Sequence, residues 1–323
     1  MNTRKTVMCL FGVITTLATT SGCLANPSSR LQDATVRVRV VDNEGQPIGG
    51  VYADCYSLSD FGSHLGLTDT NGMYSVQLRR IFAEISGDFT KTGYYKSSGV
   101  FWKWSEEERI PSSKTNFVIV MKRIVAPVQM SKKEIKAVFP RLDEPVGFDL
   151  EIGDWVFPDG KGKVTDILLT GEGHYNTVND YSFRVTVEFA GNLNGIQSFY
   201  VPKEGAGTLL RSELPPPPIA PESGYEKLFE RSIRRLPVDR RFPASSDETR
   251  RWIYRIRTKV DENGKIISAN YGWMTKDFSF GNPNGVGVIV LNYYYNPDPK
   301  SRSLEPKEIA DRQIKTYPEK KNE

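Results

Sequence analysis

The chain contains few residues of the types that carry acid–base, nucleophilic or metal chemistry. Its two histidines, His64 and His174, lie far apart in the sequence and are poor material for a zinc site. It has no G-x-S-x-G elbow, S-x-x-K, H-E-x-x-H or P-loop motif. We therefore expect no catalytic residue, no cofactor and no metal. The enzyme alternative is a polysaccharide-acting hydrolase, because two suitably spaced carboxylates are enough for that chemistry and the chain has 39 acidic residues.

Two short stretches nevertheless place reactive residue types together. Cys55 lies in an alternating, strand-like stretch, which favours a buried thiol, and the nearby His64 leaves a catalytic Cys–His pair as the alternative. Gly171–Tyr175 sets His174 beside Glu172, a combination that can do acid–base work. The same five residues fit an ordinary glycine-rich loop, and this is the interpretation that we favour.

Two further sets of residues have the chemistry of a ligand site. Exposed aromatic rings could stack on sugars, and the candidates are Trp102, Trp104, Tyr271 and Trp273. For the two tryptophans near residue 100, packing in a core is the interpretation that we favour, because aromatic rings are used more often for core burial. Arginines that could bind anionic polysaccharide or lipid head groups are Arg234, Arg235, Arg240 and Arg241. Acidic residues interleaved with them favour a solvated, ion-paired surface instead.

Residues 1–25 have the order of a secretory signal. A positively charged start precedes an apolar stretch, Val7–Ala18, that is too short to span a membrane. The Ser-Gly-Cys sequence ending at Cys23 resembles a bacterial lipobox, which implies lipidation of Cys23. Ordinary cleavage after Ala25 is the alternative.

These features predict a location and a class of partner. We expect an exported protein of the cell envelope, anchored to the membrane by the lipid on Cys23. A soluble periplasmic or secreted protein is the alternative. The net charge of +4 gives no indication of nucleic-acid binding. The expected partner is an envelope polysaccharide or a protein.

The elements that would position these residues are clearest in the stretch Val36–Leu78. Its first valines alternate with Arg37 and Arg39, so one face points to a core and the other to water. Asp42–Gly45 and Asp69–Gly72 supply the Asp/Asn and Gly residues of tight turns, and we expect each turn to close a hairpin between the strands on either side of it. This pattern predicts a small antiparallel β-domain.

Two motifs in this domain suggest a family. They are D-x-x-G-x-P-I-x-G, from Asp42 to Gly50, and T-D-x-N-G-x-Y, from Thr68 to Tyr74. With Gly93-Tyr94 and the apolar strand Phe117–Met121, residues 35–125 resemble the carboxypeptidase regulatory-like domain, a transthyretin-like (prealbumin-like) β-sandwich. The resemblance implies an accessory module that braces other domains or helps to bind glycans and carries no catalytic residue.

The rest of the chain is typical of further antiparallel β-rich units. Residues 126–213 form a second unit, in which Lys132–Val138 is a short helix or an extended connector. Asp154–Val164 resembles a segment of secreted bacterial proteins that begin with the same regulatory-like domain. Residues 214–222, LPPPPIAPE, predict a semi-rigid polyproline spacer.

Residues 223–317 predict a C-terminal α+β unit. Helices are expected at Tyr225–Arg235 and Leu304–Tyr317, with strands between them. How this unit packs against residues 126–213, and whether the two form a single domain, is left open. The complete sequence therefore predicts a mainly β, non-catalytic, exported cell-envelope protein with an accessory or interaction domain. The alternatives are a carbohydrate-binding surface module and the hydrolase.

Overall fold

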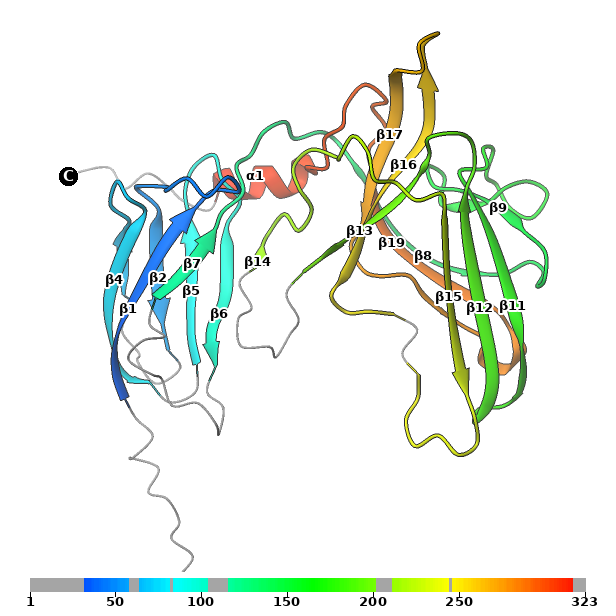
Figure 1. The fold of residues 1–323 in the computed structure, drawn as a ribbon, viewed down its shortest axis with the longest axis horizontal. Helices are drawn as coiled ribbons and strands as arrows, with labels where there is room; N and C mark the ends of the chain where they lie inside the picture. Colours follow the sequence, from blue (N-terminus) through cyan, green and yellow to red (C-terminus); the bar gives the residue numbers. More distant parts are fainter. Residues whose placement is uncertain are drawn as a thin grey trace, which may run out of the picture.

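The protein is mainly β, as its sequence predicts. The computed structural model describes residues 32–57, 64–81, 84–103, 116–201, 211–243 and 246–315. Of the described chain, 54% is strand, and the strands form four antiparallel or mixed sheets beside one short helix. They build two parts that lie side by side, an N-terminal sandwich and a larger C-terminal body (Figure 1). The signal segment with Cys23, and Trp104, lie outside the described residues.

The N-terminal sandwich is made of two sheets around one core. Its three-stranded sheet has the order β4-β1-β7 and its five-stranded sheet has the order β14-β6-β5-β2-β3. The strands are β1 (Gln32–Val41), β2 (Tyr52–Tyr56), β3 (Leu65–Leu67), β4 (Met73–Ile81), β5 (Glu84–Thr90), β6 (Ser97–Lys103), β7 (Asn116–Val120) and β14 (Arg211–Ser212). Val36, Val38 and Val40 are fully buried in the core, as their alternation predicts.

Both predicted turns of the sandwich are present, but the prediction that they close hairpins is wrong, because each turn leads from one sheet to the other: β1 pairs with β4 and β7, whereas β2 pairs with β3 and β5. The Asp42 carboxylate accepts hydrogen bonds from the backbone N–H groups of Glu44 and Gln46, and the Asp69 carboxylate accepts them from Asn71 and Met73 in the same pattern. Gly72 has φ 73°, and a Cβ there would lie 2.3 Å from a backbone oxygen of β1. Turn chemistry therefore accounts for these residues.

The C-terminal body also consists of two sheets. One has the order β10-β9-β11-β12-β15; the other has the order β13-β16-β17-β19-β18, with β8 paired to β19. The elements are β8 (Ser131–Val138), β9 (Val146–Asp149), β10 (Asp154–Trp155), β11 (Ile167–Thr177), β12 (Asp180–Phe189), β13 (Gly195–Tyr200), β15 (Leu228–Arg235), β16 (Arg250–Val260), β17 (Ile266–Met274), β18 (Ser279–Gly281), η2 (Pro283–Gly285) and β19 (Val288–Tyr295). The two sheets share one aromatic-rich core.

Strands from residues 126–213 and 223–317 pair with each other in both sheets. β12 pairs with β15, β13 with β16, and β8 with β19. The two stretches therefore build the body together. The extended alternative for Lys132–Val138 is correct, because these residues lie in β8. The helix predicted at Tyr225–Arg235 is wrong: the burial of β15 alternates, so its period is that of a strand although its apolar spacing also fits a helix.

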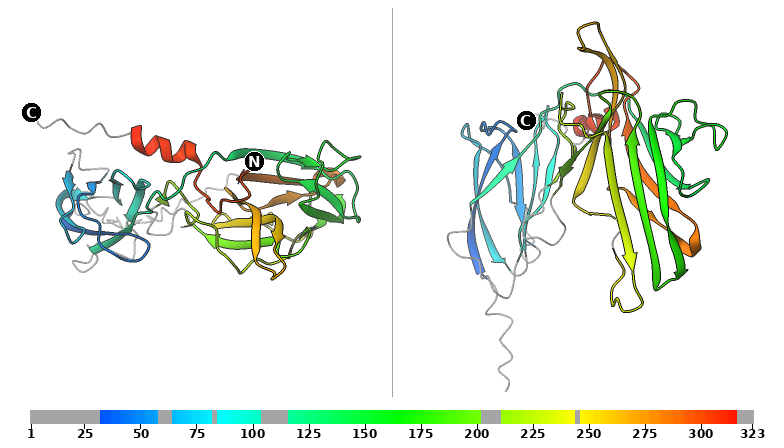
Figure 2. Two further views of the ribbon diagram at one scale, coloured as in Figure 1. Left: turned by 90° about the horizontal axis from the view of Figure 1, so that it is seen from above. Right: turned by 45° about the vertical axis from the view of Figure 1, so that its right-hand side comes forward.

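The proline-rich segment 214–222 packs between the two parts of the protein. Leu214 and Ala220 are fully buried, and the Lys122 ammonium donates to the carbonyl groups of Leu214, Pro215 and Pro216. The helix α1 (Lys307–Lys315), which lies within the predicted Leu304–Tyr317, sits where the parts meet (Figure 2). Its Gln313 side chain accepts a hydrogen bond from the backbone N–H of Lys96 in the sandwich. The segment is thus an ordered part of the interface.

Glu305 is the buried polar group that ties this interface together. Its side chain is fully buried and accepts hydrogen bonds from the backbone N–H groups of Val125 and Ala126. We expect Glu305→Ala to lower the free energy of unfolding by about 3 kcal/mol, because it leaves two partly buried donors without their charged acceptor. Urea unfolding checks this value. Glu44→Ala, in an exposed turn, is the control, and an equal effect of both changes would contradict the assignment.

Candidate functional site

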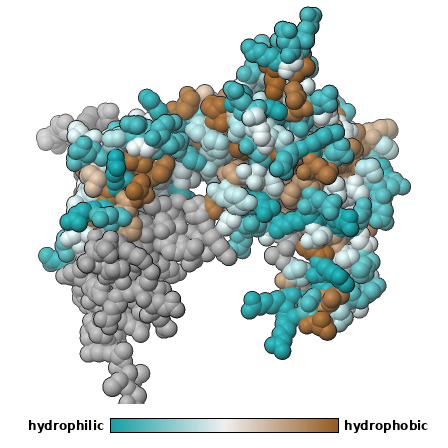
Figure 3. All heavy atoms as spheres, viewed as in Figure 1, coloured by the Kyte–Doolittle hydropathy of each residue, from teal (hydrophilic) through white to brown (hydrophobic). Residues whose placement is uncertain are grey.

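A pocket lies at one end of the body, where three connections meet. It is bounded by the hairpin that joins β11 to β12, by the loop 236–243 that follows β15, and by the chain from β18 into η2. Its volume is about 300 Å³. In Figure 3, hydrophobic residues lie beside strongly hydrophilic residues at this end of the body, which is the lower end in that view.

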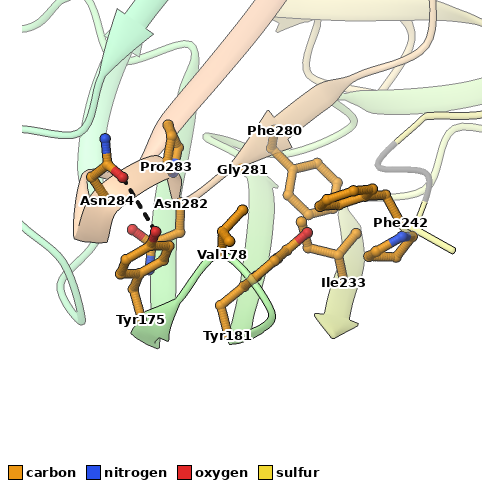
Figure 4. A pocket seen from close by; sticks show the side chains of 11 residues that line it. Tyr175, Val178, Tyr181, Ile233, Phe242, Phe280, Gly281, Asn282, Pro283 and Asn284 are labelled. Atoms are coloured by element: carbon orange, nitrogen blue, oxygen red, sulfur yellow. Dashed lines mark hydrogen bonds between the residues drawn. The ribbon is translucent and has the colours of Figure 1, made fainter. Parts of the chain in front are cut away.

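Aromatic and amide side chains line this pocket (Figure 4). The rings of Tyr175 and Tyr181 are stacked, with centroids 6.4 Å apart and an interplanar angle of 26°. The Tyr175 hydroxyl donates to the Asn284 side-chain oxygen at 3.2 Å. Phe280 and Phe242 add two further rings, and Phe242 is 65% exposed. The pocket therefore offers flat apolar surface with few polar groups.

One of these polar groups is short of a hydrogen bond. Asn282 lines the pocket and is 5% exposed, yet its Oδ1 has no hydrogen-bond partner among the described residues. A buried amide oxygen without a partner costs free energy and is satisfied when a donor reaches it. Hydroxyl groups of a ligand are suitable donors.

The predicted arginine set reaches this end of the body. Arg234 and Arg235 are the last residues of β15, and Arg240 and Arg241 lie in the loop 236–243. Arg235 is 7% exposed, whereas the other three are exposed. None of the four forms an ion pair with a described carboxylate, whereas Arg231, Arg250 and Arg257 of the same arginine-rich stretch do.

Other arginines of the same region have structural partners. Arg231 pairs with the buried Asp277, and Arg257 pairs with Asp149 and Asp166. Arg255 donates to the carbonyl groups of Leu193 and Glu222. The sequence alone does not show which arginines of this region have structural partners. That depends on the strands and loops that each side chain faces in the folded protein.

The predicted stacking residues lie away from the pocket. Tyr271 and Trp273 belong to β17 and are 3% and 2% exposed, which corrects the expectation that their rings are exposed. The indole of Trp273 stacks on Tyr294 inside the core, with centroids 5.0 Å apart. Trp102 pairs with Ile85 through its backbone in β6, and its side chain lies outside the described part of the chain.

The aromatic residues that do line the pocket are not among the stacking residues expected from the sequence. Tyr175 ends the five-residue stretch that contains His174, and Phe242 directly follows the Arg240–Arg241 pair. The position of an aromatic residue beside a turn, as for Tyr175, or beside a basic pair, as for Phe242, is the sequence feature that could have indicated these pocket residues. Pocket residues between 175 and 284 are distant in the sequence, and only the sheet order brings them together.

The structure also places the two stretches with reactive residue types in strands. Gly171–Tyr175 lies in β11 rather than in a loop, and the His174 ring contacts the Ser182 hydroxyl at 2.9 Å across the hairpin. Cys55 is fully buried in β2, as predicted, and burial raises the pKa of its thiol to about 12. This thiol stays protonated at neutral pH.

The described residues offer neither a metal-binding cluster nor a membrane-spanning helix. They contain no group of three or more His, Cys, Asp or Glu side chains arranged to hold a metal ion. None of their helices combines the length and the apolar character that a membrane crossing requires.

Comparisons with known proteins yield no family. No family model and no curated protein matches the chain. Among solved structures, part of the chain is similar to the 3-chlorocatechol 1,2-dioxygenase of Rhodococcus opacus 1CP, with 14% identity and a TM-score of 0.23 over 29% of this chain and 60% of that one. It is also similar to BcpA, the major pilin subunit of Bacillus cereus, with 9% identity and a TM-score of 0.21 over 80% of this chain and 95% of that one.

Similarities of this size carry no argument about activity. The family resemblance of residues 35–125 accordingly remains a prediction. What the structure does establish is a mainly β protein with several small antiparallel sheets.

Proposed function

We propose that the protein is a non-catalytic carbohydrate-binding protein of the cell envelope, and that the pocket beside Tyr175 holds a sugar residue. The stacked pair of Tyr175 and Tyr181 at the pocket is the observation that carries this proposal. The apolar face of a sugar ring packs on aromatic rings, while its hydroxyl groups bond to amides such as those of Asn282 and Asn284. Export and lipid anchoring through Cys23 belong to the same proposal and rest on the sequence of residues 1–25.

A binding titration tests this function. The chain from residue 26 to residue 323, which contains every described residue, is titrated with neutral and acidic polysaccharides, and the same samples are analysed for products. We expect saturable binding without products. Product release that is lost on substitution of one Asp or Glu would instead establish the hydrolase alternative.

Tyr175→Ala is expected to weaken this binding about ten-fold, because it removes one ring from the stacked pair. Tyr175 is half-buried at the pocket, so the fold tolerates the loss of its ring. Tyr200→Ala is the matched control, because Tyr200 is 63% exposed on β13 and does not line this pocket. Calorimetric titration with the best polysaccharide of the panel measures both variants, and unchanged binding by Tyr175→Ala would refute the site.

A further inference from the structure

We infer that the pocket selects an acidic sugar and that Arg235 binds its carboxylate. This inference rests on the proposed carbohydrate-binding function and adds the chemical class of the ligand.

Arg235 is a buried cation without a counter-charge. It is 7% exposed, and it forms no ion pair with a described carboxylate. Its Nε donates to the Asn179 side-chain oxygen at 3.2 Å, but its Nη1 is buried and has no hydrogen-bond partner in the described part of the chain. A buried guanidinium is costly unless an anion or several acceptors surround it. An anionic ligand group would supply what this side chain lacks.

Arg235 does not itself line the pocket but lies directly behind residues that do. Arg235 is the direct cross-strand partner of Tyr181, and Ile233, two residues earlier on the same face of β15, lines the pocket. Directly opposed side chains in an antiparallel pair have Cβ atoms about 5 Å apart. A sugar that stacks at Tyr181 therefore brings a substituent within reach of the guanidinium.

Phe242 is the cover over this cation. Its ring centroid lies 3.6 Å from the guanidinium carbon, while the ring itself is 65% exposed. A ring that buries so little surface moves at small cost. A planar carboxylate matches the fork of N–H donors that an arginine presents, and such charge-assisted pairs are stronger than neutral hydrogen bonds. Arg240 and Arg241, exposed in the same loop, add positive charge that attracts an acidic polymer.

The test compares one polymer in two charge states. The probes are polygalacturonate and its methyl-esterified form, in which the carboxylates are neutral esters on an unchanged backbone. We expect the acid form to bind about ten-fold more tightly than the ester. Equal binding of the two would overturn the inference while leaving the proposed function intact, whereas binding of neither would count against both.

Variants assign the selectivity to Arg235. Arg235→Gln is expected to bring the acid-to-ester affinity ratio close to one, while Arg234→Gln, which changes the exposed neighbour in β15, keeps most of that ratio. An equal loss of acid and ester binding in Arg235→Gln would show a merely structural role and overturn the inference.

A second variant avoids the risk that Arg235→Gln fails to fold. Phe242→Ala removes an exposed ring and uncovers the guanidinium, so the acid-to-ester ratio should be kept or raised. A fall of this ratio would contradict the role of Phe242 as a cover. Preference for vesicles of anionic phosphatidylglycerol over polygalacturonate would show that the anion is a lipid head group, and it would overturn the assignment to a sugar.

Discussion

Replacing Arg257 by methionine is expected to lower the free energy of unfolding by about 3–5 kcal/mol. Its Nε lies 2.8 Å from Asp166 Oδ1, and its Nη2 lies 2.9 Å from both Asp166 Oδ2 and Asp149 Oδ1. The side chains of Asp149 and Asp166 are 2% and 1% exposed. Removing the arginine leaves two carboxylates buried side by side without their shared cation, a far larger cost than losing a surface ion pair.

The backbone is shaped to make this contact. Arg257 has φ 54°, a left-handed conformation that is rare for residues other than glycine, and the register between β16 and β17 shifts at this position. The bulge directs the Arg257 side chain to Asp149, the last residue of β9, and to Asp166, directly before β11, in the other sheet of the body. Arg257 therefore joins the two sheets at their edge.

Urea unfolding of a matched pair of variants checks this prediction. Arg184→Met is the control, because Arg184 is 52% exposed and its carboxylate partners Glu172 and Glu230 lie 3.7 and 3.8 Å away. The control should cost at most about 1 kcal/mol. If Arg257→Met is no more costly than the control, the two aspartates are not held by this arginine.

Alkaline unfolding is the second large effect that we expect. Burial raises the pKa of five tyrosines of the described chain, all at most 5% exposed: Tyr95, Tyr254, Tyr293, Tyr294 and Tyr295. In the unfolded chain each ionises near pH 10, at about its ordinary pKa. The contribution of these five tyrosines to the free energy of unfolding is therefore complete below about pH 10. It is lost as the pH rises above this value, because the unfolded chain then ionises and the folded chain does not.

The size of the effect follows from the number of tyrosines. Each one contributes a slope of about 1.4 kcal/mol per pH unit above its unfolded pKa. Five such slopes offset a total stability of about 5–15 kcal/mol within roughly one to two pH units. We therefore expect cooperative unfolding between about pH 10 and pH 12, driven by tyrosine ionisation.

Tyrosinate absorbance and circular dichroism, followed in one titration, check this expectation. A large part of the tyrosinate signal should appear in the same step in which the strand signal is lost. Tyr200→Phe, which changes an exposed tyrosine, should leave the midpoint of that step in place. Gradual ionisation of all tyrosines with an intact strand signal would contradict the prediction.

The sequence predicts the sandwich better than the body, for a physical reason. In the sandwich, period-two alternation and turn residues suffice to find strands such as β1 and β4, although the pairing of these two strands is not local, because β2 and β3 lie between them in the chain. In the body, β8 pairs with β19, which is more than 150 residues later in the chain. No local pattern specifies such a pairing, and the apolar residues of β15 fit the period of a helix as well as that of a strand.

The candidate site shows the same limit. The residue type of Arg235 could be selected from the sequence, but its burial and its missing partner depend on β12 lying beside β15. Tyr271 and Trp273 were selected by type as well, and the sheet order buries them instead. Residue chemistry therefore predicts which residue types to consider, while non-local pairing determines which of those residues are buried and which lie at the surface.

The pairing of β8 with β19 has a consequence for the order in which the chain folds. Strands β1 to β7 all lie before residue 121. Because the chain is synthesised from its N-terminus, most of the sandwich can form before the body is complete. The body has to wait until residue 295 is available, because β8 has no other strand partner among the described residues. Closing this long loop makes body formation the slow step, during which the edge of β8 is exposed to other chains.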